Sequence, residues 1–243
     1  MAFEDVQPKT PPARAIAADA LDVGLRRHML AIFNFMFAGL ALSGAVGFFL
    51  IQSGASALFF SSGQMTPLGW GAVFAPLGLL MFASWKSQSL SLSATHATYW
   101  GLATLQGISL ALLFQSFTGQ SIAQIFFITA AAFGALSLYG YTTKRALSGI
   151  GVFLMIGLAG VVIASLVNIF IQSSLLQFVA AAIGVLVFAG LTAFDTQRLK
   201  DEYIAGLNGD VAMKAAIWGA LSLYLNFINL FQMLLTLFGQ REE

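Results

Sequence analysis

One carboxylate and three side-chain amides supply most of the chemistry in the apolar part of this chain. Asp195 directly follows the apolar run 174–194 and is the only acidic residue that touches a hydrophobic segment of that length. Asn226, Asn229 and Gln232 recur at intervals of three, which in a helix brings them near one face, about 4.5 Å of rise apart. Carboxylate and amide oxygens are hard ligands for cations. The pattern predicts the wall of an aqueous path, or a cation site with Asp195 as its charged ligand.

The same residues also have structural interpretations, which the sequence leaves open. The amides can form a hydrogen-bonded seam between helices, since such contacts are worth about 0.6 kcal/mol each in membranes. Asp195 can cap its helix or pair with Arg198 one turn later, although the helix dipole opposes an acid near a C-terminus. A further hypothesis is a latch in which basic residues, Lys144 and Arg145 from a loop or Arg198, hold Asp195.

The elements that must position these residues follow from composition. Of 243 residues, 58% are hydrophobic and 9% are charged, with a mean hydropathy of +0.85, whereas soluble domains carry about 25% charge. Seven apolar runs are long enough to cross about 30 Å of hydrocarbon, and they span 29–51, 68–85, 97–117, 121–141, 147–171, 174–194 and 215–238. A β-barrel is excluded because its strands would alternate polar and apolar residues. We therefore predict an all-α, polytopic membrane protein.

Domain organisation and orientation follow from the polar residues. We expect a polar cytoplasmic N-terminal arm over residues 1–28 and one transmembrane domain of seven helices over residues 29–243. All Lys and Arg residues except Arg241 fall in that arm or in the second, fourth and sixth loops. Short loops rich in basic residues stay in the cytoplasm, which places the N-terminus inside and the C-terminus outside. A six-span alternative, in which the last segment re-enters, stays open because Arg241 alone does not exclude it.

Most catalytic and cofactor sites lack their residues in this sequence. The absence of Cys removes thiol catalysis and thiolate metal sites. His28 and His96 lie at the ends of predicted spans, so an intramembrane haem, zinc or serine-protease site would lack its histidines. Lys214 lies at the mouth of the seventh span, too near the edge for a retinal Schiff base. We expect no enzyme activity and no cofactor other than calcium as a transported ion, and the net charge of +1 gives no indication of nucleic acid binding.

Four stretches, taken together and in order, resemble a known family. They are FAGLALSG (37–44), YGYTTKRALS (139–148), FDTQRLK (194–200) and LYLNFINLFQMLL (223–235). The combination is similar to bacterial members of the Bax inhibitor 1 family, also called transmembrane Bax-inhibitor-motif proteins, over most of residues 20–240. The resemblance implies a seven-helix bundle with a central sixth helix in the bacterial inner membrane, embedded in the lipid bilayer.

The resemblance also implies a function and its residues. Better understood members provide a pH-sensitive calcium leak, gated by two aspartates that share a proton. Asp195 matches the first aspartate, but Asn226 stands at the second position, so the proton-sharing pair is absent here. We expect a calcium leak channel whose gate and ion pathway include Asp195, Asn226, Asn229 and Gln232. The resemblance implies that the cation at this site is calcium, and we expect weak binding because Asp195 is its one carboxylate ligand. The alternative is a non-conducting regulator that binds a membrane protease, since some bacterial relatives inhibit one.

Overall fold

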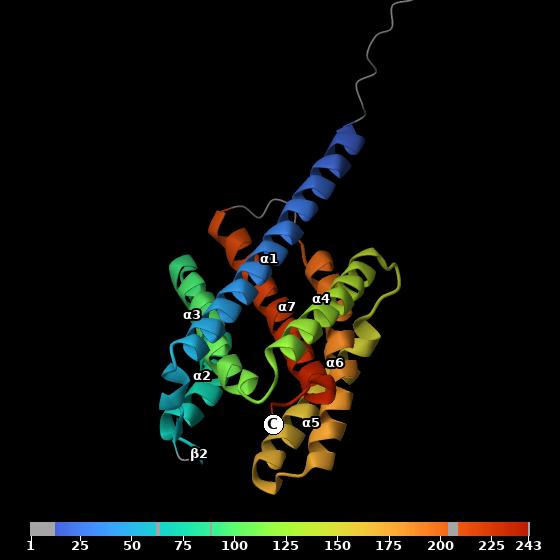
Figure 1. Ribbon diagram of the computed structural model, residues 1–243. Helices are drawn as coiled ribbons and strands as arrows, with labels where there is room; N and C mark the ends of the chain where they lie inside the picture. Colours follow the sequence, from blue (N-terminus) through green and yellow to red (C-terminus); the bar gives the residue numbers. More distant parts are fainter. Residues whose placement is uncertain (1–12, 62–63, 88, 204–208, 243) are drawn as a thin grey trace, which may run out of the picture.

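The apolar runs fold into helices that lie side by side (Figure 1). This computed structural model describes residues 13–61, 64–87, 89–203 and 209–242. Within these ranges the helices are α1 (Ala13–Gln52), α2 (Pro67–Lys86), α3 (Leu92–Phe114), α4 (Gly119–Thr142), α5 (Ser148–Ile171), α6 (Ser174–Asp201) and α7 (Gly209–Phe238). A 3-10 turn, η1 (Ala55–Leu58), and two antiparallel two-residue strands, β1 (Phe60–Ser61) and β2 (Gln64–Met65), connect α1 to α2. All seven helices are long and apolar enough to cross a membrane, which confirms the predicted fold class.

Several helices extend beyond the apolar runs that predict them. Helix α1 begins at Ala13, so residues 13–28 of the predicted arm are helical, whereas residues 1–12 lie outside the described residues. Helix α6 continues to Asp201, which places Asp195 inside the helix and not after it. The reason is that apolar runs end at the first charged residue, while Gln, Arg, Leu and Lys are strong helix formers that continue a helix into a polar environment.

Hydroxyl side chains fix where four of the helices begin. The hydroxyl of each capping residue accepts a hydrogen bond from a backbone N–H three residues later, which satisfies one of the free donors at the helix start. The caps are Thr66 for α2, Ser91 for α3, Thr118 for α4 and Ser173 for α6. These polar starts stand at the ends of apolar segments and help to set where each span begins.

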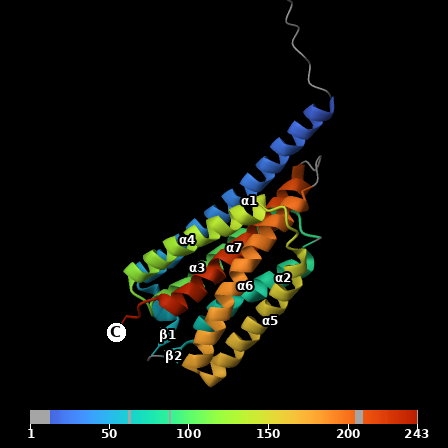
Figure 2. The ribbon, with the colours of Figure 1, turned by 90° about the vertical axis from the view of Figure 1, so that its right-hand side faces the viewer.

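Helices α6 and α7 occupy the middle of the bundle, side by side (Figure 2). Helix α6 packs against α4, α5 and α7, as expected for a central sixth helix, and α7 also contacts α1, α3 and α4. By contrast, α5 packs mainly on α6 and turns large side chains outward, such as Phe170, which is 87% exposed. An apolar outer surface around a better-buried centre is what a lipid environment requires.

Close packing brings the backbones of neighbouring helices together. Gly140 of α4 lies directly against the backbone of Ala193 in α6, where a methyl group would clash. Between α1, α3 and α7, the buried Ser43 hydroxyl donates to the carbonyl oxygen of Ala103 and shares a 2.6 Å hydrogen bond with the Tyr224 hydroxyl. Small residues at these contacts allow the close approach that membrane helices need for association.

Candidate functional site

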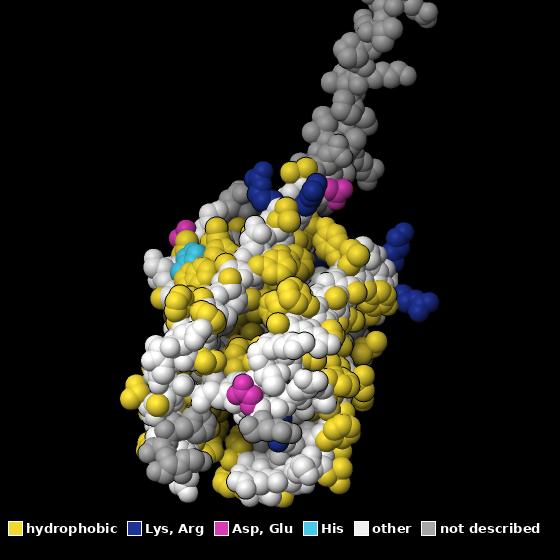
Figure 3. Space-filling view, in the orientation of Figure 1, with side chains coloured by type: hydrophobic (Ala, Val, Ile, Leu, Met, Phe, Trp, Pro, Cys, Tyr) yellow, Lys and Arg dark blue, Asp and Glu magenta, His cyan; other side chains and the backbone are white. Residues whose placement is uncertain are grey.

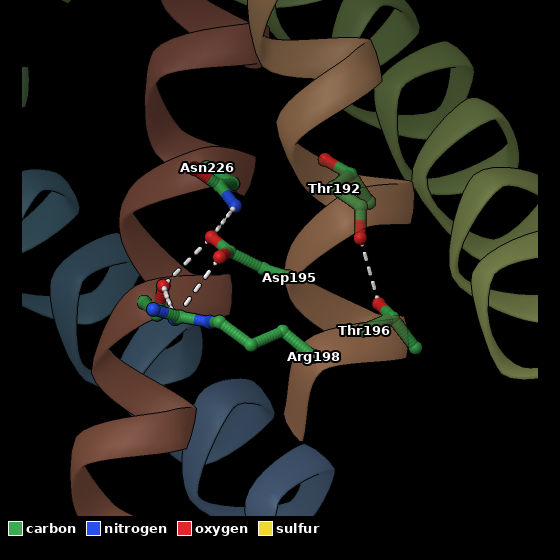
Figure 4. Close-up of polar contacts among 6 residues, drawn as sticks. Thr192, Asp195, Thr196, Arg198 and Asn226 are labelled. Atoms are coloured by element: carbon green, nitrogen blue, oxygen red, sulfur yellow. Dashed lines mark hydrogen bonds and ion pairs between the residues drawn. The ribbon is translucent and has the colours of Figure 1, made fainter. Parts of the chain in front are cut away.

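Asp195 projects from α6 toward α7, where a serine and an asparagine meet it (Figure 4). Ser222 and Asn226 are four residues apart on α7, so both lie on the face that packs against α6. The Asp195 Oδ2 atom accepts hydrogen bonds from the Ser222 hydroxyl and the Asn226 Nδ2 atom, each at 2.8 Å. The side chain of Asp195 is only 10% exposed. The structure therefore places a largely buried carboxylate in a polar cradle.

Arg198 supplies the positive charge that balances this carboxylate. Its guanidinium lies 3.0 Å from the Asp195 Oδ1 atom and also reaches the Ser222 hydroxyl at 3.4 Å. Within the described ranges this is the single ion pair between side chains. A carboxylate has about four lone-pair positions, and three of them already have partners here. A cation that bound Asp195 would have to displace Arg198 or coordinate beside it.

Two buried threonines of α6 lie beside Asp195 but take no part in its contacts. The Thr192 hydroxyl donates to the carbonyl oxygen of Phe188, and the Thr196 hydroxyl donates to the carbonyl oxygen of Thr192. Figure 4 shows both on a different side of the helix from the Asp195 carboxylate. Their hydroxyls are satisfied by the backbone of their own helix, so Ser222, Asn226 and Arg198 form the polar environment of Asp195.

A large cavity extends from Asp195 along α7. Its volume is about 950 Å³, and its walls come mainly from α2, α3, α5, α6 and α7. Along α7 the lining runs from Ser222 to Thr236, or about 21 Å at 1.5 Å per residue. The polar side chains that line it are Gln106, Ser109, Ser116, Asp195, Arg198, Ser222, Asn226, Asn229, Gln232 and Thr236. The structure thus brings Asp195 and all three amides of the sequence pattern to one cavity.

The amides differ in what they do at the cavity wall. Asn226 is buried and bonded to Asp195, whereas Asn229 is half-buried and donates to the carbonyl oxygen of Leu225 in its own helix. Gln232, also half-buried, lies one turn further along the same wall. The three amides form a polar stripe along the cavity wall, and Asp195 and Arg198 lie at one end of it. These two are the only charged side chains among the described residues that line this cavity.

Beyond Asp195, in the direction of the C-terminal end of α6, the helices close against one another. Gly219 of α7 packs so tightly that an added methyl group would lie 2.9 Å from Leu199 of α6 and 3.0 Å from Ile32 of α1. Leu199 and Ile32 are both buried. Gly219, Leu199 and Ile32 thus form an apolar contact of three helices, one turn before Ser222 on α7.

The expected latch between Asp195 and the loop residues Lys144 and Arg145 is not formed in the described structure. Both side chains are exposed, and the carboxylate pairs with Arg198 of its own helix instead. What holds that loop to α6 is Gln197: its amide nitrogen donates to the carbonyl oxygen of Arg145, and its amide oxygen accepts from the Leu147 N–H. The absence of this contact in the described structure has a geometric reason. Asp195 and Gln197 point to different sides of α6, and only Gln197 faces the loop.

The remaining metal-ligating residues do not gather near Asp195. In the part of the chain that the structure describes, no three His, Cys, Asp or Glu side chains lie together. His28 packs on the ring of Tyr203 and His96 on the ring of Phe35, so the two histidines have different surroundings. A calcium ion at this site would therefore find one carboxylate, with amide and hydroxyl oxygens as its other protein ligands.

Sequence reasoning missed three polar residues of the site. Ser222 continues the polar stripe one turn before Asn226, and this i, i+4 spacing was the signal that could have revealed it. Gln106 and Ser109 face the stripe from α3 across the cavity. Their contribution depends on which helices are neighbours, which spacing along the chain does not contain.

Comparison with known proteins gives a consistent relationship over nearly the whole chain. A family model described as "Inhibitor of apoptosis-promoting Bax1" matches residues 25–243. An uncharacterized protein of Caulobacter vibrioides is 43% identical over 95% of this chain and 97% of its own length. The inner membrane protein YbhL of Escherichia coli K12 is 42% identical over 90% of this chain and 93% of its own. An uncharacterized protein of Deinococcus radiodurans is 36% identical over 90% of this chain and 92% of its own length.

Proposed function

This chain belongs to the family of inhibitors of apoptosis-promoting Bax1, and on that premise we propose that it is a cation leak channel for calcium. The observation that carries the proposal is the cavity along α7, whose wall carries a stripe of polar side chains with the largely buried Asp195 at one end. An acid at membrane depth is costly unless it serves a site or a network. Here the carboxylate is the negative end of a polar wall about 21 Å long, against a hydrocarbon thickness of about 30 Å.

The conformation described above is the closed one in this proposal. Arg198 neutralises Asp195, and the contact of Leu199, Ile32 and Gly219 closes the way beyond it. Opening requires Arg198 to move off the carboxylate and α6 and α7 to separate at that contact. We propose that pH modulates this permeation, because Asp195 is the one acid among the described residues that line the cavity.

The proposed orientation places the site near the cytoplasmic side. Lys86 is the last residue of α2, Lys144 and Arg145 lie between α4 and α5, and Lys214 lies in the second turn of α7. These segments lie at the end of the bundle where α6 also ends (Figure 1). The positive-inside rule assigns that end to the cytoplasm and the end with Arg241 to the outside. The relative YbhL carries the name of an inner membrane protein, which supports the bacterial inner membrane as the location.

Calcium flux into liposomes tests the proposal directly. The Asp195→Asn variant is expected to lower the flux at least tenfold, because it leaves the positive charge of Arg198 unopposed in the path of a cation. The variant keeps the shape of the side chain and its contact with Ser222. A matched control is Asp210→Asn, which removes an exposed acid at the start of α7 and leaves the flux unchanged. Equal flux through native protein and Asp195→Asn would refute a gate at Asp195.

A non-conducting regulator of another membrane protein, such as a membrane-bound protease, is the second candidate. It is supported by α1, whose N-terminal part extends beyond the ends of the other helices (Figures 1 and 2). Deletion of residues 2–20 is expected to abolish such docking, measured by co-purification of the membrane partner, and to leave calcium flux intact. Loss of flux with retained co-purification would instead show that this segment serves conduction.

A further inference from the structure

A second cavity opens on the other side of the bundle, between α1 and α4. Both helices pack against α7, whose buried Phe227 lies at the floor of the groove between them. The groove has a volume of about 560 Å³, and its walls are almost entirely apolar, including Phe33 and Phe37 of α1 and Phe133 of α4. Figure 3 shows this face, with hydrophobic side chains between α1 and α4 and basic side chains at the top. The groove faces the region that lipid tails fill.

Two polar groups interrupt this apolar surface. Arg26 of α1 lines the groove at the end of the bundle where α4 terminates, and it is exposed. In the described residues it forms no ion pair. Ser137 of α4 also lines the groove, is only 4% exposed, and its hydroxyl has no hydrogen-bond partner. An unpaired hydroxyl in an apolar wall costs free energy unless a ligand supplies an acceptor.

We propose that this groove binds one anionic phospholipid, with its phosphate on Arg26, a glycerol ester carbonyl on Ser137 and an acyl chain along the phenylalanines. The spacing supports the assignment. Tyr141 lines the groove near the C-terminal end of α4, at the same end as Arg26. Ser137 precedes Tyr141 by four residues, so Ser137 lies about 6 Å deeper in the groove along the helix axis. Ester carbonyls likewise lie one glycerol unit below the phosphate, on the side of the tails.

Charge and space favour a lipid of this kind over other occupants. The Lys200 ammonium does not line the groove, but it lies 5.6 Å from the centre of the Tyr141 ring and donates to the Tyr141 carbonyl oxygen. A second positive charge therefore lies near this end of the groove, which suits an anionic headgroup. At Gly134, which lines the groove, an added methyl group would meet nothing within 4 Å. An acyl chain can therefore lie over Gly134 without moving any neighbouring side chain. A larger side chain at this position would occupy the space of the acyl chain.

Native mass spectrometry of the purified full-length protein tests the proposal, using phosphatidylglycerol and phosphatidylcholine with identical acyl chains. We expect one phosphatidylglycerol to bind about tenfold more tightly than phosphatidylcholine, because both lipids carry the phosphate but only phosphatidylcholine adds a choline cation, which Arg26 repels. Arg26→Gln is expected to remove this preference. Its control, Arg27→Gln, changes the same charge on the next, exposed residue, which does not line the groove, and keeps the preference.

Two further variants test the depth of the site. Ser137→Ala is expected to weaken binding of both lipids about threefold, the effect of one neutral hydrogen bond. Gly134→Leu is expected to abolish retention of either lipid, whereas Gly160→Leu, at an open position on the exposed face of α5, leaves it unchanged. Thermal unfolding of each variant in detergent confirms that it is folded.

Several results would overturn the proposal. Equal binding of the two lipids to the native protein would show that the groove does not select an anionic headgroup. An equal loss of the preference for phosphatidylglycerol in Arg26→Gln and Arg27→Gln would indicate attraction to the whole basic surface. Retention of phosphatidylglycerol by folded Gly134→Leu would place the lipid elsewhere. A dimer that Gly134→Leu dissociates would assign the groove to a second copy of this chain.

Discussion

Replacing Asn226 with Asp is expected to give the calcium flux a steep dependence on pH that the native chain lacks. The Asn226 Nδ2 atom lies 2.8 Å from the Asp195 Oδ2 atom, so the substitution brings two carboxylates within hydrogen-bond distance. Two such groups share a proton and titrate as a coupled pair. When the two carboxylates share a proton, no cation fits between them. When the proton leaves, they form a calcium site with two negative charges, twice the ligand charge of the native site. Flux between about pH 6 and pH 8 should rise at least tenfold in the variant, against about threefold or less in the native protein.

The control for this experiment is Asn229→Asp, measured in the same liposomes. Asn229 lines the same cavity one turn away, but its amide bonds to the carbonyl oxygen of Leu225 and not to Asp195. This variant adds the same charge to the pathway without creating a pair. If Asn229→Asp gave the same pH response as Asn226→Asp, the response would be caused by the added charge in the cavity and not by a shared proton. If native protein took up protons in two coupled steps that Asp195→Asn removed, the single-acid interpretation would itself be wrong.

Much of this arrangement follows from the sequence because hydrophobicity and helical spacing act locally. Seven runs of apolar residues predict seven helices, and the intervals from Asn226 to Gln232 place three amides on one wall. The ends of the helices were harder to predict, since Asp195 and the residues after it are polar but still helical in α6. Hydropathy indicates which residues lie in the lipid, whereas a helix continues into the polar region as long as its residues favour helical structure.

The contacts around Asp195 depend on side-chain direction, which one sequence constrains weakly. Lys144 and Arg145 have the right charge for a latch, but their loop meets Gln197, on another side of α6. The i, i+3 spacing of Asp195 and Arg198 allowed the observed pair, and the sequence left that interpretation open beside the functional one. The structure shows the pair formed in this conformation, among the polar side chains that line the cavity.

Replacing Arg198 with Gln is expected to raise the calcium flux about tenfold at limiting calcium. The guanidinium lies 3.0 Å from the Asp195 Oδ1 atom, so an incoming cation would compete with its positive charge for the carboxylate. Without it, Asp195 keeps its bonds to Ser222 and Asn226 but has no positive partner, and its field acts on the ion alone. The paired carboxylate and guanidinium of the native site together carry no net charge, whereas the variant site carries one negative charge.

Protein stability gives an independent measurement of the same effect. Arg198 is 41% exposed, so its loss should lower the free energy of unfolding by only about 1 kcal/mol. Saturating calcium should then stabilise Arg198→Gln more than the native protein, by up to about 2.7 kcal/mol at a concentration one hundredfold above the dissociation constant. Arg145→Gln removes an equal charge from an exposed position and should behave as native in both assays. A folded Arg198→Gln variant with native flux and no added calcium stabilisation would exclude Arg198 as the group that closes this site, because the carboxylate it uncovers would then attract no cation.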